Sequence, residues 1–170
     1  MAKLAVDRIV EREGREAPCR TEEIQLGMPI DAGELPAVEG VDDDVRAHLA
    51  ARYGYAAKDV LDLVASDGTL GARISPDMPD LLAEAVFAAR REQARSVADV
   101  LLRRTRLGLL DARRLTADGA DGPETVARAL GTELGWDGAR LQTEVGGWQE
   151  VARAEGLVPG QGAPEPERVA

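Results

Sequence analysis

The residues that could carry covalent or metal chemistry are few in this sequence. It contains one histidine, His48, and one cysteine, Cys19, separated by a stretch rich in proline and glycine. A zinc site needs several such ligands, and a Cys/His nucleophilic pair needs a third group that orients the imidazole. We therefore predict neither a metal site nor a catalytic pair, and we interpret His48 as a packed or surface histidine of a short helix.

The acidic and glycine motifs have similarly plain interpretations. Asp42-Asp43-Asp44 could hold a divalent cation, but it precedes a predicted helix, whose positive end favours acidic residues. Paired carboxylates such as Glu84 and Glu92 cannot be assigned acid and base roles without a known pocket. Glycine-rich dinucleotide and P-loop motifs are absent, and Gly146-Gly147 predicts a place where another helix packs closely. We predict no catalytic and no cofactor-binding residue.

Arginines gather in the middle of the chain, most densely as Arg103-Arg104-Thr105-Arg106. They lack the interleaved aromatic residues of a nucleic-acid patch. Two interpretations stay open with equal weight: the guanidinium groups pair with carboxylates within the bundle or across a domain interface, or they form a solvated helix face. We take Arg103, Arg104, Arg106 and Glu84 as candidates for interdomain or intra-bundle polar contacts.

The composition indicates the elements that position these residues. Alanine, leucine and valine dominate an apolar fraction of 44%, while aromatic residues make up 3%, which favours close-packed helices. The net charge of −10 opposes binding to nucleic acid and to anionic lipid. One cysteine cannot form an internal disulfide, and no signal peptide or bilayer-spanning run is visible, so we expect a cytoplasmic protein.

The chain divides into four segments by composition. Residues 1–14 predict a short amphipathic helix, because apolar residues share a stripe that Gly14 ends. Residues 15–42 hold too many prolines and glycines for a continuous element and predict a linker. Residues 43–157 predict a helical domain, and residues 158–170 predict a disordered tail that lacks apolar content.

Apolar residues recur at helical spacing throughout the third segment. The predicted helices start near Asp44, Ala57, Leu82, Ser96, Asp121 and Asp137. Only the short pieces 23–26 and 73–74 are candidates for strand, and both are weak. We therefore predict an all-α fold: a small bundle of about five or six helices, preceded by a separate short helix and a linker.

The order of several short segments resembles the C-terminal end of FAD-dependent glycerol-3-phosphate dehydrogenases and oxidases, over roughly residues 1–157. The most specific segments are Arg103-Arg104-Thr105-Arg106 and Leu134-Gly135-Trp136-Asp137. The others are Met1-Ala2-Lys3-Leu4-Ala5-Val6-Asp7, Cys19-Arg20-Thr21, His48-Leu49-Ala50-Ala51-Arg52-Tyr53-Gly54, Ala83-Glu84-Ala85-Val86, Arg90-Arg91-Glu92 and Asp99-Val100-Leu101-Leu102.

This resemblance implies an accessory role in an enzyme that oxidises sn-glycerol 3-phosphate to dihydroxyacetone phosphate and passes electrons through FAD to quinone. In the family, a flavin-binding domain does the chemistry, and a Gly-Lys-Leu-Thr-Thr-Tyr-Arg-like segment of the flavin site precedes the helix that residues 1–14 resemble. The chain begins just beyond that segment, so we expect a fragment or a split or decayed copy that is not catalytic alone. The implied partner is the flavin domain, and peripheral membrane association belongs to the parent enzyme.

Two other functions are weighed beside this one. The first is a stand-alone helical module that binds a protein through the exposed face of its first helix. The second is a small enzyme in its own right, which would need a convergent polar pocket, such as His48 in a closed cleft with Glu84 or Asp99.

Overall fold

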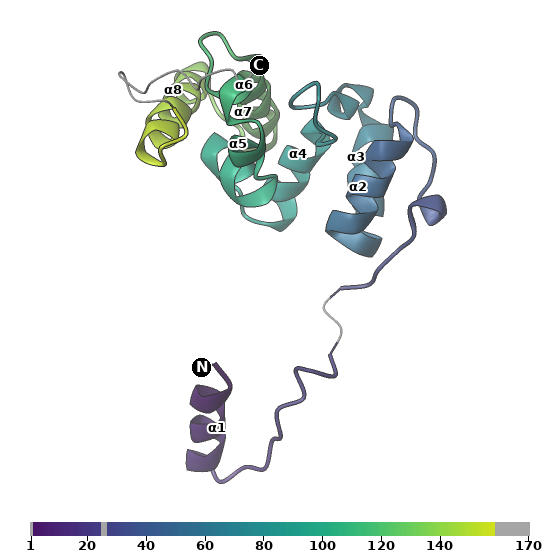
Figure 1. Cartoon of the computed structure of the whole chain (residues 1–170), viewed down its shortest axis with the longest axis vertical. Helices are drawn as coiled ribbons and strands as arrows, with labels where there is room; N and C mark the ends of the chain where they lie inside the picture. Colours follow the sequence, from purple (N-terminus) through teal and green to yellow (C-terminus); the bar gives the residue numbers. More distant parts are fainter. Residues whose placement is uncertain (1, 25–26, 159–170) are drawn as a thin grey trace, which may run out of the picture.

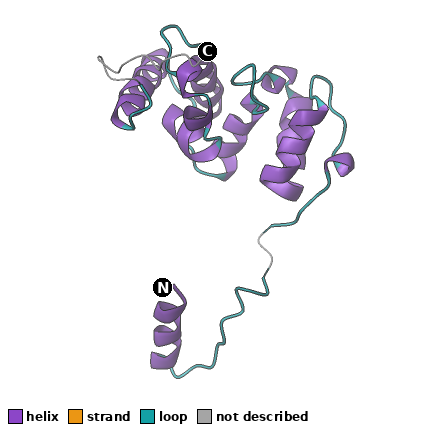
Figure 2. Cartoon of the chain, in the orientation of Figure 1, coloured by secondary structure: helices purple, strands orange, loops and turns teal. Residues whose placement is uncertain are grey.

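The structure is a computed structural model that describes residues 2–24 and 27–158. Within these ranges it contains eight α-helices and no strand, which confirms the all-α prediction (Figure 2). The strand candidate at 73–74 forms only an isolated bridge between Arg73 and Leu81. Of the other candidate, Glu23 lies in a turn and Ile24 in a bend, and its last two residues are outside the described ranges.

The first helix, α1 (Ala2–Arg12), buries none of its residues. It stands at the far end of an extended connection that leads to the helical body (Figure 1). The connection itself reaches the core: after a short 3-10 turn, η1 (Ala32–Glu34), Leu35 is only 3% exposed. The segment that composition predicts as a linker thus supplies an anchor to the helical body.

The first half of the body consists of three helices. α2 (Asp43–Tyr53) and α3 (Ala57–Ser66) form a hairpin through the short turn η2 (Gly54–Ala56). Another turn, η3 (Gly68–Gly71), leads to α4 (Leu82–Arg91). Their inward residues form one apolar cluster with Leu35: Val45, Leu49, Ala57, Val60, Leu61, Val64, Leu81, Ala83 and Phe87.

The second half packs on the other side of α4. It comprises the π-helix η4 (Asp99–Arg104), the four-residue helices α5 (Leu107–Leu110) and α6 (Ala112–Leu115), and the longer α7 (Asp121–Leu134) and α8 (Gly138–Ala154). Their core residues join the other face of α4: Ala85, Ala88, Val97, Val100, Leu101, Leu107, Leu115, Val126, Leu130 and Trp148. Because α4 contributes to both clusters, it is the central element of the fold.

Several helix boundaries follow directly from the sequence. The carboxylate of Asp137 accepts a hydrogen bond from the Arg140 amide at the start of α8, and Gly135 ends α7 with a left-handed φ of 68°. The Ser96 hydroxyl accepts a hydrogen bond from the Asp99 amide where a new helix begins, as predicted.

The interpretation of Gly146-Gly147 as a close-packing site is wrong, because a Cβ at either position would meet no atom within 4 Å. Close packing instead uses Gly108, where a Cβ would lie 2.7 Å from the Trp148 ring, and Gly131, where it would lie 2.7 Å from Leu141. The predicted tail, 158–170, lies outside the described residues except for Val158, which packs against the core.

Candidate functional site

A network of charged side chains joins α2 to the start of α4. His48 and Arg52 lie one turn apart on α2, and Asp80 and Glu84 lie four residues apart at the start of α4, so each pair can share a face. The Arg52 guanidinium donates through Nη1 to Asp80 and to Glu84 Oε1, the latter at 2.9 Å. The Tyr53 hydroxyl also donates to Glu84 Oε1, at 3.0 Å.

The network also reaches the backbone of two other elements. Arg52 Nη2 donates to the carbonyl of Thr105, just beyond the π-helix η4, at 3.1 Å. The second oxygen of Glu84 accepts a hydrogen bond from the Leu81 amide at 2.7 Å, which caps the first turn of α4. Arg52 therefore connects the α2–α3 half of the body to the half that begins with η4.

The two carboxylates of this network are almost fully buried. Asp80 is 1% exposed and Glu84 is not exposed. Burial of an unpaired carboxylate costs several kcal/mol, so both require nearby positive charge. Burial alone would raise the pKa of Asp80, but the nearby His48 imidazole and the charge of Arg52 outweigh it and lower that pKa below its usual value.

The carboxylates change the protonation of their neighbours. The carboxylates of Asp80 and Glu84, whose oxygens lie 3.6 and 3.5 Å from His48 Nε2, outweigh the partial burial of His48 and raise its pKa to about 9. The pKa of the Tyr53 hydroxyl is raised strongly by burial and by the charge of Glu84, so the hydroxyl remains a donor. At neutral pH the network thus holds two carboxylates, Arg52 and a protonated His48, and its formal charges balance.

This balance decides what the network can do chemically. One ligand atom each from His48, Asp80 and Glu84 lie within 4.8 Å of one another, as the ligands of a metal ion would. However, Arg52 already bonds to both carboxylates, and a protonated imidazole can neither bind a metal nor act as a base. The hypothesis of a small enzyme requires a reactive cleft, such as one in which His48 and Glu84 meet. Here the two residues do lie close together, but they belong to an ion-pair network that contains no nucleophile.

The protonated His48 makes the stability of the chain depend on pH. Its pKa is about 9 in the folded protein and 6.5 for an unperturbed histidine, so its stabilisation is complete below pH 6.5 and is lost as pH rises through 9. We expect the free energy of unfolding to fall by about 3 kcal/mol over this range, since each unit of pKa difference corresponds to about 1.4 kcal/mol. Urea unfolding from pH 6 to 10 measures it, and the curve should be flatter in His48→Gln. Parallel curves for both proteins would contradict a charged His48.

The candidate arginines of the middle segment lie in different surroundings. Arg103 pairs with Asp99 at 2.8 Å, and Arg104 pairs with Glu92 at 3.3 Å. Both pairs lie within the helical body, and Glu84 belongs to the network above. Arg106 is exposed in the left-handed conformation, with φ at 61°, and forms no ion pair among the described residues. Arg103 and Arg104 line one hollow together with Arg52 and Tyr53, the partners of Glu84, whereas Arg106 is not part of that lining.

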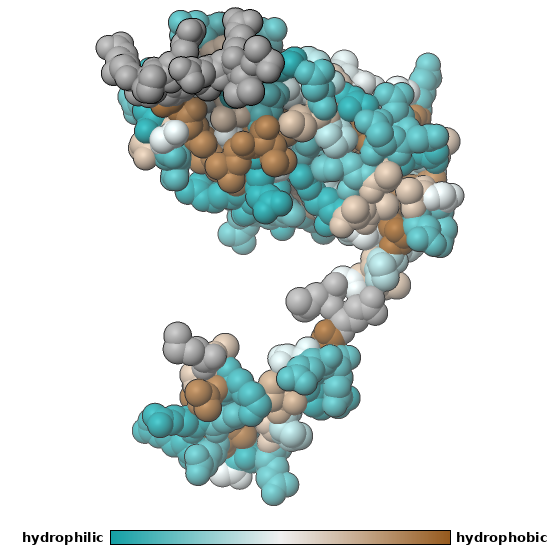
Figure 3. All heavy atoms as spheres, in the orientation of Figure 1, coloured by the Kyte–Doolittle hydropathy of each residue, from teal (hydrophilic) through white to brown (hydrophobic). Residues whose placement is uncertain are grey.

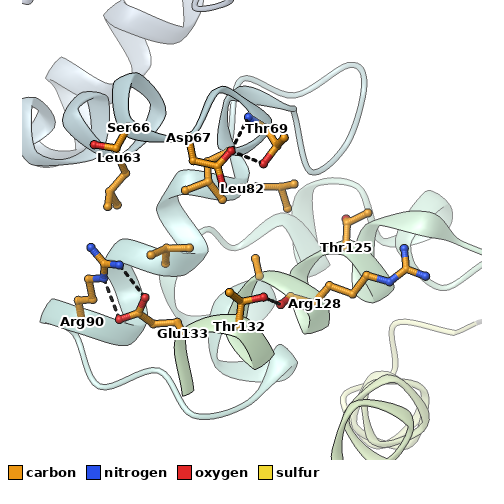
Figure 4. A pocket seen from close by; sticks show the side chains of 13 residues that line it. Leu63, Ser66, Asp67, Thr69, Leu82, Arg90, Thr125, Arg128, Thr132 and Glu133 are labelled. Atoms are coloured by element: carbon orange, nitrogen blue, oxygen red, sulfur yellow. Dashed lines mark hydrogen bonds and ion pairs between the residues drawn. The ribbon is translucent and has the colours of Figure 1, made fainter. Parts of the chain in front are cut away.

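A groove of about 420 Å³ runs across α4 between α3–η3 and α7. Its floor is apolar, and Figure 4 shows Arg90 and Glu133 pointing toward each other at one end. They form two hydrogen bonds of 2.8 and 2.7 Å, and Asp67 is bonded to Thr69. Arg128 also pairs with Glu124, so among the described residues Asp67 is the one charged side chain of the groove without an ion pair, and its carboxylate is already hydrogen-bonded to Thr69.

Residues 19–141 match the family described as the C-terminal domain of alpha-glycerophosphate oxidase. The chain belongs to this family. Glycerol-3-phosphate dehydrogenase 2 of Mycobacterium tuberculosis is 32% identical over 97% of the chain. The mitochondrial glycerol-3-phosphate dehydrogenase SDP6 of Arabidopsis thaliana is 34% identical over 64%, and the mitochondrial enzyme of Bos taurus is 28% identical over 62%.

These findings confirm the resemblance seen in the sequence. The chain spans 28% of the length of the Mycobacterium relative, 16% of the Arabidopsis relative and 14% of the bovine relative. No solved structure matches the chain. Among the described residues, no helix of this alpha-glycerophosphate oxidase C-terminal domain is long and apolar enough to cross a membrane.

Sequence reasoning missed three members of the network in this domain: Arg52, Tyr53 and Asp80. Arg52 and Tyr53 lie in the family-like segment His48–Gly54, and the other local signal is the spacing of four residues in His48/Arg52 and in Asp80/Glu84. That spacing is common on solvated helix faces, and nothing local indicates that these two pairs meet across 28 to 32 residues of chain.

Proposed function

We propose that this chain is the C-terminal accessory domain of an FAD-dependent glycerol-3-phosphate dehydrogenase, with the catalytic part in polypeptide outside this chain. That part would bind FAD, which accepts electrons from sn-glycerol 3-phosphate, yields dihydroxyacetone phosphate and passes the electrons to quinone. The observation that carries the proposal is the family match over residues 19–141. A cytoplasmic location, with peripheral contact of the whole enzyme to the inner face of the membrane, is part of this proposal.

The residues of this chain do not fit FAD themselves. A flavin dinucleotide needs glycines that let the backbone approach its phosphates. Here, among the described residues, a Cβ would collide at four glycines, and each of them packs against the chain's own atoms: Gly54 on the Met28 carbonyl, Gly108 on Trp148, Gly122 on Leu115 and Gly131 on Leu141. These glycines serve internal packing, so the proposal places the flavin entirely in the catalytic part.

The helix α1 supports a physical connection to that part. Its apolar side chains Leu4, Val6 and Ile9 are 69%, 55% and 61% exposed. Such side chains contribute no burial free energy while they face water, so a partner surface would stabilise them. We propose that residues 1–14 complete the flavin domain, that residues 15–42 connect it to the body, and that residues 43–157 form the accessory domain. In this division, Arg103, Arg104 and Glu84 stabilise the body internally, and Arg106 is free to face the catalytic part.

A chimera tests this proposal. In the Mycobacterium tuberculosis relative, the matching 28% of the sequence is replaced by this chain. We expect the chimera to retain flavin and to oxidise glycerol 3-phosphate. Leu4→Asp with Ile9→Asp should lower flavin retention and activity by about tenfold or more, because each leucine or isoleucine loses about 1.5–3 kcal/mol of burial.

The control variant is Tyr55→Asp, at a side chain that is 51% exposed on the body. It should leave flavin retention unchanged, and none of these substitutions should alter the unfolding midpoint of the isolated chain. A chimera without flavin would contradict the accessory-domain proposal. A flavin-containing chimera that tolerates both aspartates in α1 would contradict only the packing proposed for α1.

A stand-alone helical interaction module is the second candidate, and the unpartnered face of α1 favours it. Such a module would bind a protein unrelated to flavin enzymes through Leu4 and Ile9. Its body should remain monomeric and folded without any catalytic part. The two candidates therefore differ in whether a flavin-bearing polypeptide copurifies with the chain.

A further inference from the structure

Two exposed leucines project from a corner of the helical body. Leu109 and Leu110, in the short helix α5, are 58% and 59% exposed. Three arginines flank them in the sequence: Arg106 just before α5, and Arg113 and Arg114 in α6. We name these five residues the basic corner. Figure 3 shows apolar side chains gathered on the surface over α5.

The backbone of the basic corner is fixed by packing against the core. Leu107 and Leu115 on either side of it are buried in the core, and Gly108 fits against the ring of Trp148. Asp111, between the two short helices, accepts a hydrogen bond from the buried Ser75 hydroxyl. The two leucines are therefore presented to solvent by a fixed scaffold, because a local rearrangement that buries them would break these contacts.

The charge of the basic corner differs from that of the rest of the chain. Residues 103–114 contain five arginines and one aspartate, whereas the chain as a whole carries −10. Arg106 and Arg113 form no ion pair with any carboxylate in residues 2–24 and 27–158. The third arginine of the corner, Arg114, pairs with Asp77 and Asp111. Two exposed leucines beside the unpaired Arg106 and Arg113 match a protein-binding surface whose partner is apolar at the centre and acidic at the rim.

We infer that the basic corner is the surface on which the catalytic part of the enzyme docks against the helical body. The inference rests on the proposed function and adds the location and the chemistry of the contact. The surface of the catalytic part that faces the corner would be an apolar patch with an acidic rim. The Mycobacterium relative continues for 72% of its length beyond the part that this chain spans, since the chain covers 28% of it. A covalently linked surface is present at millimolar effective concentration, which exceeds that of any free partner.

The test measures the accessibility of the corner in the chimera described above. In a Cys19→Ser background, Leu110→Cys is labelled with a maleimide in the isolated chain and in the chimera. Tyr55→Cys, on an exposed side chain away from the corner, is the matched control. We expect the labelling rate of Leu110→Cys to fall by about tenfold or more in the chimera, because burial at an interface excludes the reagent. The rate of Tyr55→Cys should not change.

Each other outcome overturns the inference. If the flavin-containing chimera labels Leu110→Cys as fast as the isolated chain does, the catalytic part docks elsewhere although the proposed function stands. A chimera that binds no flavin removes the proposed function and the inference with it. Protection in the isolated chain at high concentration assigns the corner to a second copy, and protection of that chain only by phosphatidylglycerol vesicles assigns it to lipid.

Discussion

Arg52→Met should lower the free energy of unfolding by about 3–5 kcal/mol, the cost of removing one partner from a buried ion pair. The substitution leaves Asp80, 1% exposed, and Glu84, not exposed, with only the protonated His48 as a counter-charge. The Thr105 carbonyl loses its donor as well. Because whole domains are stable by about 5–15 kcal/mol, the variant should be marginal at 37 °C. Urea unfolding followed by far-ultraviolet circular dichroism measures the loss.

Two controls separate a buried pair from an exposed one. Arg128→Met breaks an arginine–glutamate pair whose side chains are 67% and 45% exposed, and it should cost less than about 1 kcal/mol. Arg52→Met combined with Asp80→Asn and Glu84→Gln removes the uncompensated charges and should recover most of the stability. A loss below about 1 kcal/mol in the single variant would show that water reaches these carboxylates.

Trp148→Ala should cost about 3–5 kcal/mol, the usual range for a large aromatic residue in a core. Trp148 is 1% exposed, its ring contacts the region of Gly108, and its Nε1 donates to the Leu115 carbonyl at 2.7 Å. It thereby fixes α8 against α5 and α6. Trp148→Phe keeps most of the apolar volume but leaves that carbonyl without its donor, so we expect a smaller loss of about 1–3 kcal/mol.

Trp136→Ala is the matched control for this prediction, because Trp136 is only partly buried and lies beside Arg140. It should cost clearly less than Trp148→Ala in the same unfolding experiment. Equal losses at the two tryptophans would contradict the packing of α8 described here.

Helix starts and stops could be predicted from the sequence because their signals are local. Asp137 caps α8 and Gly135 ends α7 through contacts within a few residues. The prediction from Gly146-Gly147 fails for the complementary reason: a glycine marks a close approach only when a specific neighbour is present. That neighbour exists at Gly108, whose partner Trp148 is 40 residues away along the chain.

The candidate site was predictable only in part. Glu84, Arg52 and Tyr53 all lie in family-like segments, but no local pattern shows that Glu84 meets two residues of α2 that come 31 to 32 residues earlier. The π-helical form of η4 has no local signature in Asp99–Arg104, and its end is held by a tertiary contact, the hydrogen bond from Arg52 Nη2 to the Thr105 carbonyl 53 residues away. Tertiary contacts of this kind decide which arginines are paired inside the body and which stay exposed.

The most direct test of the accessory-domain proposal is immunodepletion of an extract from the source cells. An antibody raised against residues 43–157 should remove glycerol-3-phosphate oxidation from the extract, and the captured material should contain flavin. This result would follow whether the catalytic part is in the same polypeptide or in a separate one that stays bound. If the antibody captures the chain without flavin and the oxidation activity remains in the extract, the chain is not part of that enzyme.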